Sequence, residues 1–181
     1  MKYLIRFNEK LENENIILNQ SIDKTFNLIK NKLGEKLLQK IKSVAIFRIE
    51  PNSKFCSCWD SQISIGEFSI LRHGKQPKYS DGKWDGDWNL YFDKPLDETV
   101  LHELCHVFDN IIFGKKSKFG SIRSLTSDNW NFDPKNAPTK YGTDGKDEDF
   151  VASLMYYITD RKHLLKDGRD KFLEELINQY I

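Results

Sequence analysis

The segment His102-Glu103-Leu104-Cys105-His106 decides how the fold of this 181-residue sequence is interpreted. It has the pattern H-E-x-x-H and lies in a stretch whose apolar residues recur at helical spacing. Each residue of a helix rises about 1.5 Å, so side chains four residues apart return to one face about 6 Å along the axis. Two imidazoles in this arrangement can bind one metal ion, with zinc–nitrogen distances of about 2.0–2.1 Å. The chain has four histidines and two belong to this motif, so a chance match is uncommon.

The residues around the motif predict an amphipathic helix that begins near Asp97. Pro95 suits the turn before the helix, Asp97 is a common type of N-cap residue, and Glu98 places an acid in the first turn. Gly114 and the two lysines after it predict the C-terminal end. The alternative is an ordinary amphipathic helix whose two histidines are four residues apart by chance. The face expected to be buried consists of Leu101, Leu104, Cys105, Phe108, Ile111 and Ile112.

Two histidines do not complete a catalytic zinc site, which has three protein ligands and a water. The extended pattern H-E-x-x-H-x-x-G-x-x-H is excluded, because this chain has Asp109 and Ile112 where that pattern has Gly and His. The remaining downstream histidine, His163, lies in a polar run and is expected on the surface. The third ligand is therefore sought among the downstream carboxylates.

Three acids open a second apolar segment, which covers residues 150–158 and predicts another helix. Each of the three acids could be the third ligand, and helical phase alone does not choose among them. Acids in a first turn also have a simpler use, because they offset the positive end of the helix dipole. The three are Asp147, Glu148 and Asp149.

A longer pattern resembles the catalytic domain of anthrax lethal factor and the related Pro-Pro endopeptidases. That family has H-E-x-x-H-x-x-D, then a Tyr, then a Glu seven residues later, then a helix rich in aromatic residues and Ala. The chain has Asp109, Tyr141 and Glu148 at these places. Tyr156-Tyr157 and a final amphipathic helix, expected from about residue 170 to 181, extend the resemblance, which spans roughly the second half of the chain.

The resemblance also implies a role for each residue of the site. Glu103 would be the general base, Tyr141 would donate a hydrogen bond to the oxyanion, and Asp109 would orient a ligand histidine. The sequence departs from the family at Ala152, where an acid is common, and at Val151, where Ala is usual. The zinc ligands that the resemblance implies are His102, His106 and Glu148.

These roles describe a zinc-dependent endopeptidase. Zinc lowers the pKa of a bound water toward about 7, and an ionised Glu103 can accept the proton of that water and pass it to the leaving amine. The substrate is expected to be an extended protein or peptide segment that binds along an exposed sheet edge, with no proline preference implied. The alternatives are an inactive zinc-binding recognition module, or a toxin or effector protease with a specific host target. Tyr141 could also be a loop aromatic held by burial.

Composition limits the partners and the location of the protein. The 28 basic and 27 acidic residues give a net charge of +1, so no strong attraction to nucleic acid or membrane is expected. No apolar run approaches the roughly 18 residues of a membrane span, and the first ten residues lack the apolar core of a signal peptide. We expect a monomer that is cytoplasmic or exported by a non-classical route, although the resembled family is often secreted. Cys105 is expected in the core, while Cys56 and Cys58 are too close in sequence for a usual disulfide.

The element pattern predicts the α+β class, in which a mixed, twisted sheet packs on helices in a single zincin-like domain over residues 1–181. Residues 1–94 are expected to be rich in sheet, and residues 95–181 to be helical and to carry the zinc ligands. A turn-rich stretch at 78–88 with Trp84 and Trp88 is expected to be a flap beside the substrate or a loop anchored on the core. In the connection over residues 115–140, Trp130 and Phe132 are expected to pack on the core. The expected strands are 2–7, 43–50, 62–72 and 88–93, and the first long helix is expected at 21–42.

Overall fold

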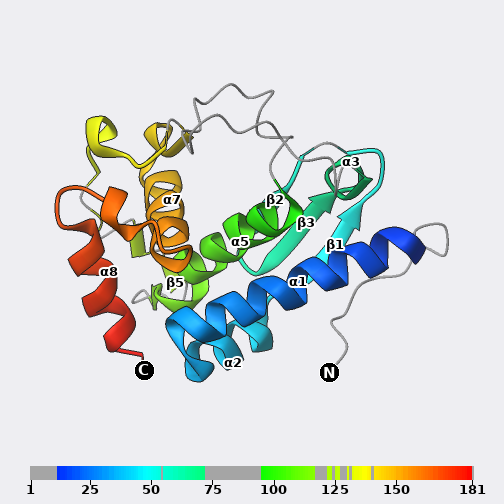
Figure 1. Cartoon of the computed structure of the whole chain (residues 1–181), viewed down its shortest axis with the longest axis horizontal. Coiled ribbons are helices and arrows are strands. Elements are labelled where there is room, and N and C mark those ends of the chain that lie inside the picture. The colour runs from blue at the N-terminus through cyan, green and yellow to red at the C-terminus, as the bar shows by residue number, and fades with distance from the viewer. Residues whose placement is uncertain are drawn as a thin grey trace.

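The computed structural model describes residues 12–53, 55–71, 95–116, 122–123, 125–126, 130, 132–139 and 141–180, with the backbone alone at 12, 115–116, 122–123 and 141. These residues form an α+β arrangement, as the sequence predicts, in which the small mixed sheet lies on one side of the molecule and α7 and α8 lie on the other (Figure 1). The strands expected at 2–7 and 88–93, and the turn-rich stretch at 78–88, lie outside the described residues.

Two helices replace the single long helix expected near the N-terminus. Helix α1 covers Glu12–Leu33 and α2 covers Glu35–Val44, so the helix begins earlier than predicted and is interrupted. The break is at Gly34, whose φ of 86° lies in the left-handed region that Gly adopts at little cost. The apolar face that the sequence indicates is nevertheless buried, because both helices pack on the same core. Its residues are Ile22, Phe26, Ile29, Leu33, Leu37 and Ile41.

The sheet has three strands in the order β1-β3-β2. Strand β1 (Ile46–Glu50) is parallel to β3 (Gln62–Gly66), and β2 (Ser57–Trp59) is antiparallel to β3, which makes β2 an outer strand of the described sheet. The second half of the strand expected at 62–72 is wrong, since α3 occupies Glu67–Leu71. Strand β2 was not expected, because three residues are too few to show a period of two.

Helix α5 (Leu96–Val107) carries the H-E-x-x-H motif through the middle of the molecule (Figure 1). It packs against α1, α7 (Lys146–Ile158) and the strands β2 and β3, and most of its residues are buried. Among its neighbours, α7 also contacts α8 (Arg169–Asn178). A helix buried on several sides holds its side chains in fixed directions, so α5 can present both histidines to one neighbouring element.

The beginning of α5 differs from the prediction. Pro95 is the N-cap residue, and Asp97 lies inside the first turn. The Asp97 carboxylate instead accepts a hydrogen bond of 2.9 Å from the Ser21 hydroxyl and forms an ion pair with Lys24, which ties α5 to α1. The helix continues as the π-helical turn η2 (Phe108–Ile112) and ends before Gly114, as expected.

Short elements complete the described chain. Beyond Gly114, strands β4 (Lys115–Lys116) and β5 (Ile122–Arg123) pair antiparallel. Trp130 is buried and Phe132 packs against the core, which confirms the prediction for this connection. No helix among the described residues is both long and apolar enough to cross a membrane. The single-turn helices are η3 (Pro134–Asn136), η4 (Tyr141–Thr143) and η5 (Lys162–Leu164).

Candidate metal centre

The two histidines of α5 point their rings toward each other and toward α7. Their Nε2 atoms lie 3.3 Å apart, and their ring centroids are separated by 4.9 Å. His102 is buried, whereas His106 is partly exposed. The spacing of four residues along the helix therefore places the two imidazole nitrogens close enough to bind one ion, as the sequence predicts.

Glu148, in the first turn of α7, completes the group. One oxygen of its carboxylate, Oε2, lies 3.4 Å from Nε2 of His102, and the other, Oε1, lies 3.4 Å from Nε2 of His106. The neighbouring acids are directed elsewhere, since Asp147 is exposed and Asp149 is buried against other partners. Contact between α5 and α7 thus distinguishes Glu148 from the two acids that helical phase could not exclude.

The spacing of these atoms fits a small divalent cation. Ligand atoms about 2.0–2.1 Å from an ion in tetrahedral directions lie about 3.3–3.4 Å from one another. The two imidazole nitrogens are 3.3 Å apart, and each lies 3.4 Å from a different oxygen of the Glu148 carboxylate. One ligand atom from each of the three residues lies within 4.8 Å of the other two. In addition, Glu148 Oε2 is buried and has no hydrogen-bond partner among the described residues. A buried carboxylate oxygen without a donor is costly, and a bound cation would satisfy it.

The electrostatic surroundings also favour a positive charge. Burial on its own would lower the pKa of His106, but the hydrogen bond with Glu148 and the negative charges of Glu148, Glu103 and Asp147 outweigh it, so the pKa is raised. The same carboxylates would attract a divalent ion, which binds the ring in its neutral form. Nitrogen and carboxylate donors of this kind suit zinc, and they also suit iron and other first-row metals.

Glu103, the expected general base, is 2% exposed and follows His102 directly in α5. Its charge acts on the thiol of Cys58 in β2, where burial first and the charges of Glu103 and Asp60 second raise the thiol pKa to about 12. Burial and the same glutamate also raise the thiol pKa of Cys105, which is a core residue as predicted. Glu103 therefore lies in the region where α5 meets β2.

Asp109 lies in η2 and is buried. Its two carboxylate oxygens accept hydrogen bonds from the Thr126 backbone N–H at 3.0 Å and the Thr126 hydroxyl at 2.9 Å. These bonds tie the segment after β5 to the end of the motif helix. Burial raises the pKa of Asp109, against the opposing effects of Thr126 and His106. That Asp109 orients a ligand histidine stays a prediction. The sequence does not indicate that Thr126 donates hydrogen bonds to Asp109.

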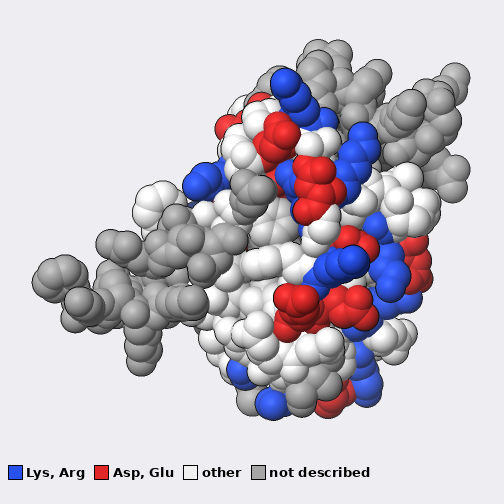
Figure 2. Space-filling view, turned by 90° about the vertical axis from the view of Figure 1, so that its left-hand side faces the viewer, with Lys and Arg blue, Asp and Glu red and all other residues white. Residues whose placement is uncertain are grey.

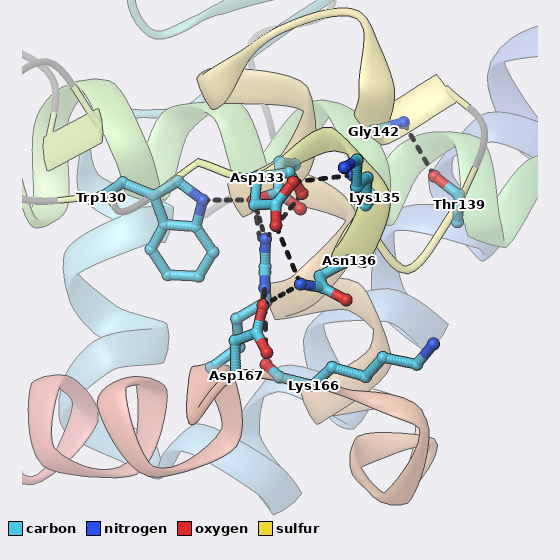
Figure 3. A network of polar contacts seen from close by, with 10 residues as sticks. Trp130, Asp133, Lys135, Asn136, Thr139, Gly142, Lys166 and Asp167 are labelled. Carbon is cyan, nitrogen blue, oxygen red and sulfur yellow. Dashed lines mark hydrogen bonds and ion pairs between the residues drawn. The ribbon is translucent and has the colours of Figure 1, made fainter.

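Tyr141 contributes its backbone to η4, while its side chain lies outside the described part of the structure. The turn packs closely on the start of α7, because a Cβ added to Gly142 would lie 3.4 Å from Cα of Asp149 and 3.3 Å from Oγ1 of Thr139. The Gly142 N–H donates a hydrogen bond of 2.9 Å to the same hydroxyl (Figure 3). The backbone of Tyr141 is thereby held beside the turn that carries Glu148.

The other candidates have no part in this group. His163 is exposed, as expected. Ala152 and Val151, where the sequence departs from the resembled family, are both buried in α7.

On the face that includes α8, acidic and basic side chains are interspersed, in keeping with a net charge of +1 (Figure 2). Among the described residues, the group that could hold a metal ion is the one expected from the sequence, namely His102, His106 and Glu148.

Comparison with known proteins adds no assignment. No family model matches the chain, and neither a curated protein nor a solved structure matches it. The similarity to lethal factor and the Pro-Pro endopeptidases therefore stays a prediction from the sequence motif.

Proposed function

We propose that this chain is a zinc-dependent endopeptidase with a zincin-like fold. The observation that carries the proposal is the convergence of three potential ligands from two helices, with atom separations of 3.3–3.4 Å. The Oε2 atom of Glu148 supports it, because this atom is buried without a hydrogen bond and lies 3.4 Å from Nε2 of His102, where a cation between the two would satisfy it. The proposed ligands are His102, His106 and Glu148.

The neighbouring residues supply the groups that peptide hydrolysis needs. A bound zinc ion would lower the pKa of a water and polarise the scissile carbonyl. Glu103, adjacent to the first ligand, is proposed to take the proton of the attacking water and to give it to the leaving amine. Tyr141, at the turn beside Glu148, is proposed to donate its phenolic hydrogen to the oxygen that becomes negative in the transition state.

Strand β2 is the proposed place for an extended substrate. It is an outer strand of the described sheet and contacts α5, so a peptide that paired along it would pass close to the motif. Two large side chains of this region are exposed, Phe55 at 69% and Trp59 at 81%. Exposed aromatic residues beside such a strand can contact the side chains of a bound peptide.

Metal analysis combined with a cleavage screen tests the proposal. We expect the purified protein to contain about one zinc per chain and to cleave members of a broad peptide library. Activity should disappear with a chelator and return with added zinc. Tight zinc binding without cleavage of any library member would instead identify a recognition module. A protein that takes up no divalent metal would refute the proposed site.

A further inference from the structure

The residue after the proposed ligand Glu148 forms a buried polar cluster of its own. Asp149 is 0% exposed, and its Oδ2 atom accepts hydrogen bonds from Trp130 Nε1 at 2.6 Å and from Arg169 Nη2 at 2.9 Å and Nε at 3.3 Å. The Trp130 indole nitrogen points into this cluster (Figure 3). The other oxygen, Oδ1, is buried without a hydrogen-bond partner, so the cluster depends on Oδ2.

The cluster joins three parts of the chain. Arg169 is the first residue of α8 and is 4% exposed, so the ion pair with Asp149 links α8 to the first turn of α7 inside the protein. The same guanidinium reaches the backbone carbonyl of Asp133 at 3.5 Å, just before η3. A buried carboxylate that lost its cation would be strongly unfavourable, so these segments are held together by more than surface contacts.

The first turn of α7 lacks a side-chain cap. Its N-cap residue is Gly145, which makes no side-chain cap hydrogen bond, and Lys146 and Asp147 are exposed. The first turn of a helix frays easily when its N–H groups lack a cap. Asp149 is the first residue of α7 whose side chain accepts hydrogen bonds from buried partners, and its Cα also lies close to Gly142 of η4.

Asp149 and Glu148 are adjacent, and successive side chains of a helix point about 100° apart. Glu148 therefore faces α5 while Asp149 faces Trp130 and α8. Any rotation or fraying of this turn that broke the bonds of Asp149 would also move the Glu148 carboxylate. Metal ligands must stay within about 0.2 Å of their required distances, so such a movement would weaken the site.

We propose that Asp149, held by Trp130 and Arg169, is a positioning residue that fixes the first turn of α7 so that Glu148 meets both imidazoles. The inference rests on the proposed function, because it assigns a role beside the proposed metal ligands. The competing explanation is that the cluster only docks α8 onto α7. Both explanations predict a less stable protein when the cluster is damaged, but only positioning predicts weaker metal binding by a protein that is still folded.

The test compares two variants of the cluster with a matched control. Asp149→Asn removes the negative charge but preserves size, and Trp130→Phe removes one hydrogen bond but preserves the ion pair. Leu173→Ala is the control, because Leu173 is a fully buried residue of α8 whose truncation should destabilise the packing of α8 without removing any polar group of the cluster. Zinc affinity is measured by competition with a chromophoric chelator, at a temperature where circular dichroism shows every variant to be folded. Cobalt is used as a second ion, because its visible absorption reports the ligand geometry.

We expect both cluster variants to bind zinc at least about tenfold more weakly and to show an altered cobalt spectrum. Leu173→Ala should lower the melting temperature and leave both metal readouts unchanged. If Asp149→Asn does not fold, Trp130→Phe decides the question. If the folded cluster variants have the zinc affinity and the cobalt spectrum of the wild type, the positioning role is overturned, while the proposed metal site is not. An equal loss in Leu173→Ala would also overturn it. A wild-type protein that binds neither zinc nor cobalt would overturn the proposed function together with this inference.

Discussion

The Nε2 atoms of His102 and His106 lie 3.3 Å apart, although one helical turn separates their backbones. Two imidazole nitrogens at this distance suit adjacent positions around one small ion, and the Glu148 carboxylate lies 3.4 Å from each. Helical spacing brings the two histidines together, and packing of α7 on α5 adds Glu148. Removal of any one of the three side chains should therefore weaken metal binding.

Replacement of Glu148 by Ala should weaken zinc binding by more than about 100-fold, because one of three protein ligands is lost. Asp147→Ala is the matched control, since Asp147 is an exposed acid in the same turn that contributes negative charge but no ligand atom, and it should weaken binding far less. Chelator competition measures both affinities. An unchanged zinc affinity in Glu148→Ala would reject this residue as a ligand.

Glu103→Gln should retain zinc and lose peptide cleavage. The amide is close in size to the carboxylate, but it cannot accept the proton of the attacking water. Metal content is measured by mass spectrometry, and cleavage is measured with the peptide that the wild type cuts best. A variant that keeps more than about a tenth of the wild-type kcat would argue against a general-base role, because that role contributes about 10²–10⁴-fold.

Tyr141→Phe should lower kcat by roughly 10²–10³ with little change in melting temperature, as for the loss of an oxyanion donor. The affinity for zinc should stay the same, because the phenol is not a proposed ligand. If Tyr141 instead only anchors its loop, the substitution should leave kcat close to the wild-type value.

Zinc binding should release a proton from His106 and weaken as the pH falls. The pKa of this ring is raised in the metal-free protein, chiefly because the hydrogen bond and charge of Glu148 outweigh the opposing effect of burial. Below the folded pKa the protonated ring competes with zinc. The folding stability of the metal-free protein has the opposite pH dependence. The stabilisation that protonated His106 gives the fold is fully present below the unfolded pKa of about 6.5, and it is lost as the pH rises through the higher folded pKa. Calorimetry in buffers of different ionisation enthalpy counts the protons. No proton release on zinc binding between pH 6 and 7 would contradict this assignment.

The Cys58 thiol should react slowly with thiol reagents in the metal-free protein. Burial, followed by the charge of Glu103, raises its pKa to about 12, so the thiolate fraction at pH 8 is on the order of a thousandfold below that of a free cysteine. The measurement uses a variant in which Cys56 and Cys105 are Ser. Adding Glu103→Gln should speed the reaction, because a repelling negative charge is removed. The same rate with and without Glu103 would show that its charge does not reach β2.

The parts of the structure that the sequence could predict depend on local periodicity. The spacing of His102 and His106 fixes their common face, and the apolar stripe of α1 and α2 is buried as expected. The break at Gly34 was missed because the stripe continues across it. The sequence predicts a strand where α3 forms, since Phe68 and Ile70 are two residues apart and fit a period of two.

Local sequence patterns could not predict the contacts between segments that are distant in the chain. Helical phase could not choose Glu148 over its neighbours, because the choice depends on how α7 packs on α5; only the family resemblance indicated this residue. Similarly, Asp149 and Arg169 lie on different helices, and nothing in either segment indicates that they meet. Asp109 and Thr126 are a further example, because the partner is in a connecting segment without a periodic pattern.

The position of Arg169 in the sequence has a consequence for biosynthesis. A ribosome translates α5 and α7 before it reaches this residue, so a nascent chain acquires all three proposed ligands before the cation that faces Asp149 exists. Until α8 has emerged, the start of α7 would carry a carboxylate with no partner for its charge. If Asp149 has the proposed positioning role, the emergence of α8 would be the step of synthesis that fixes the turn carrying Glu148.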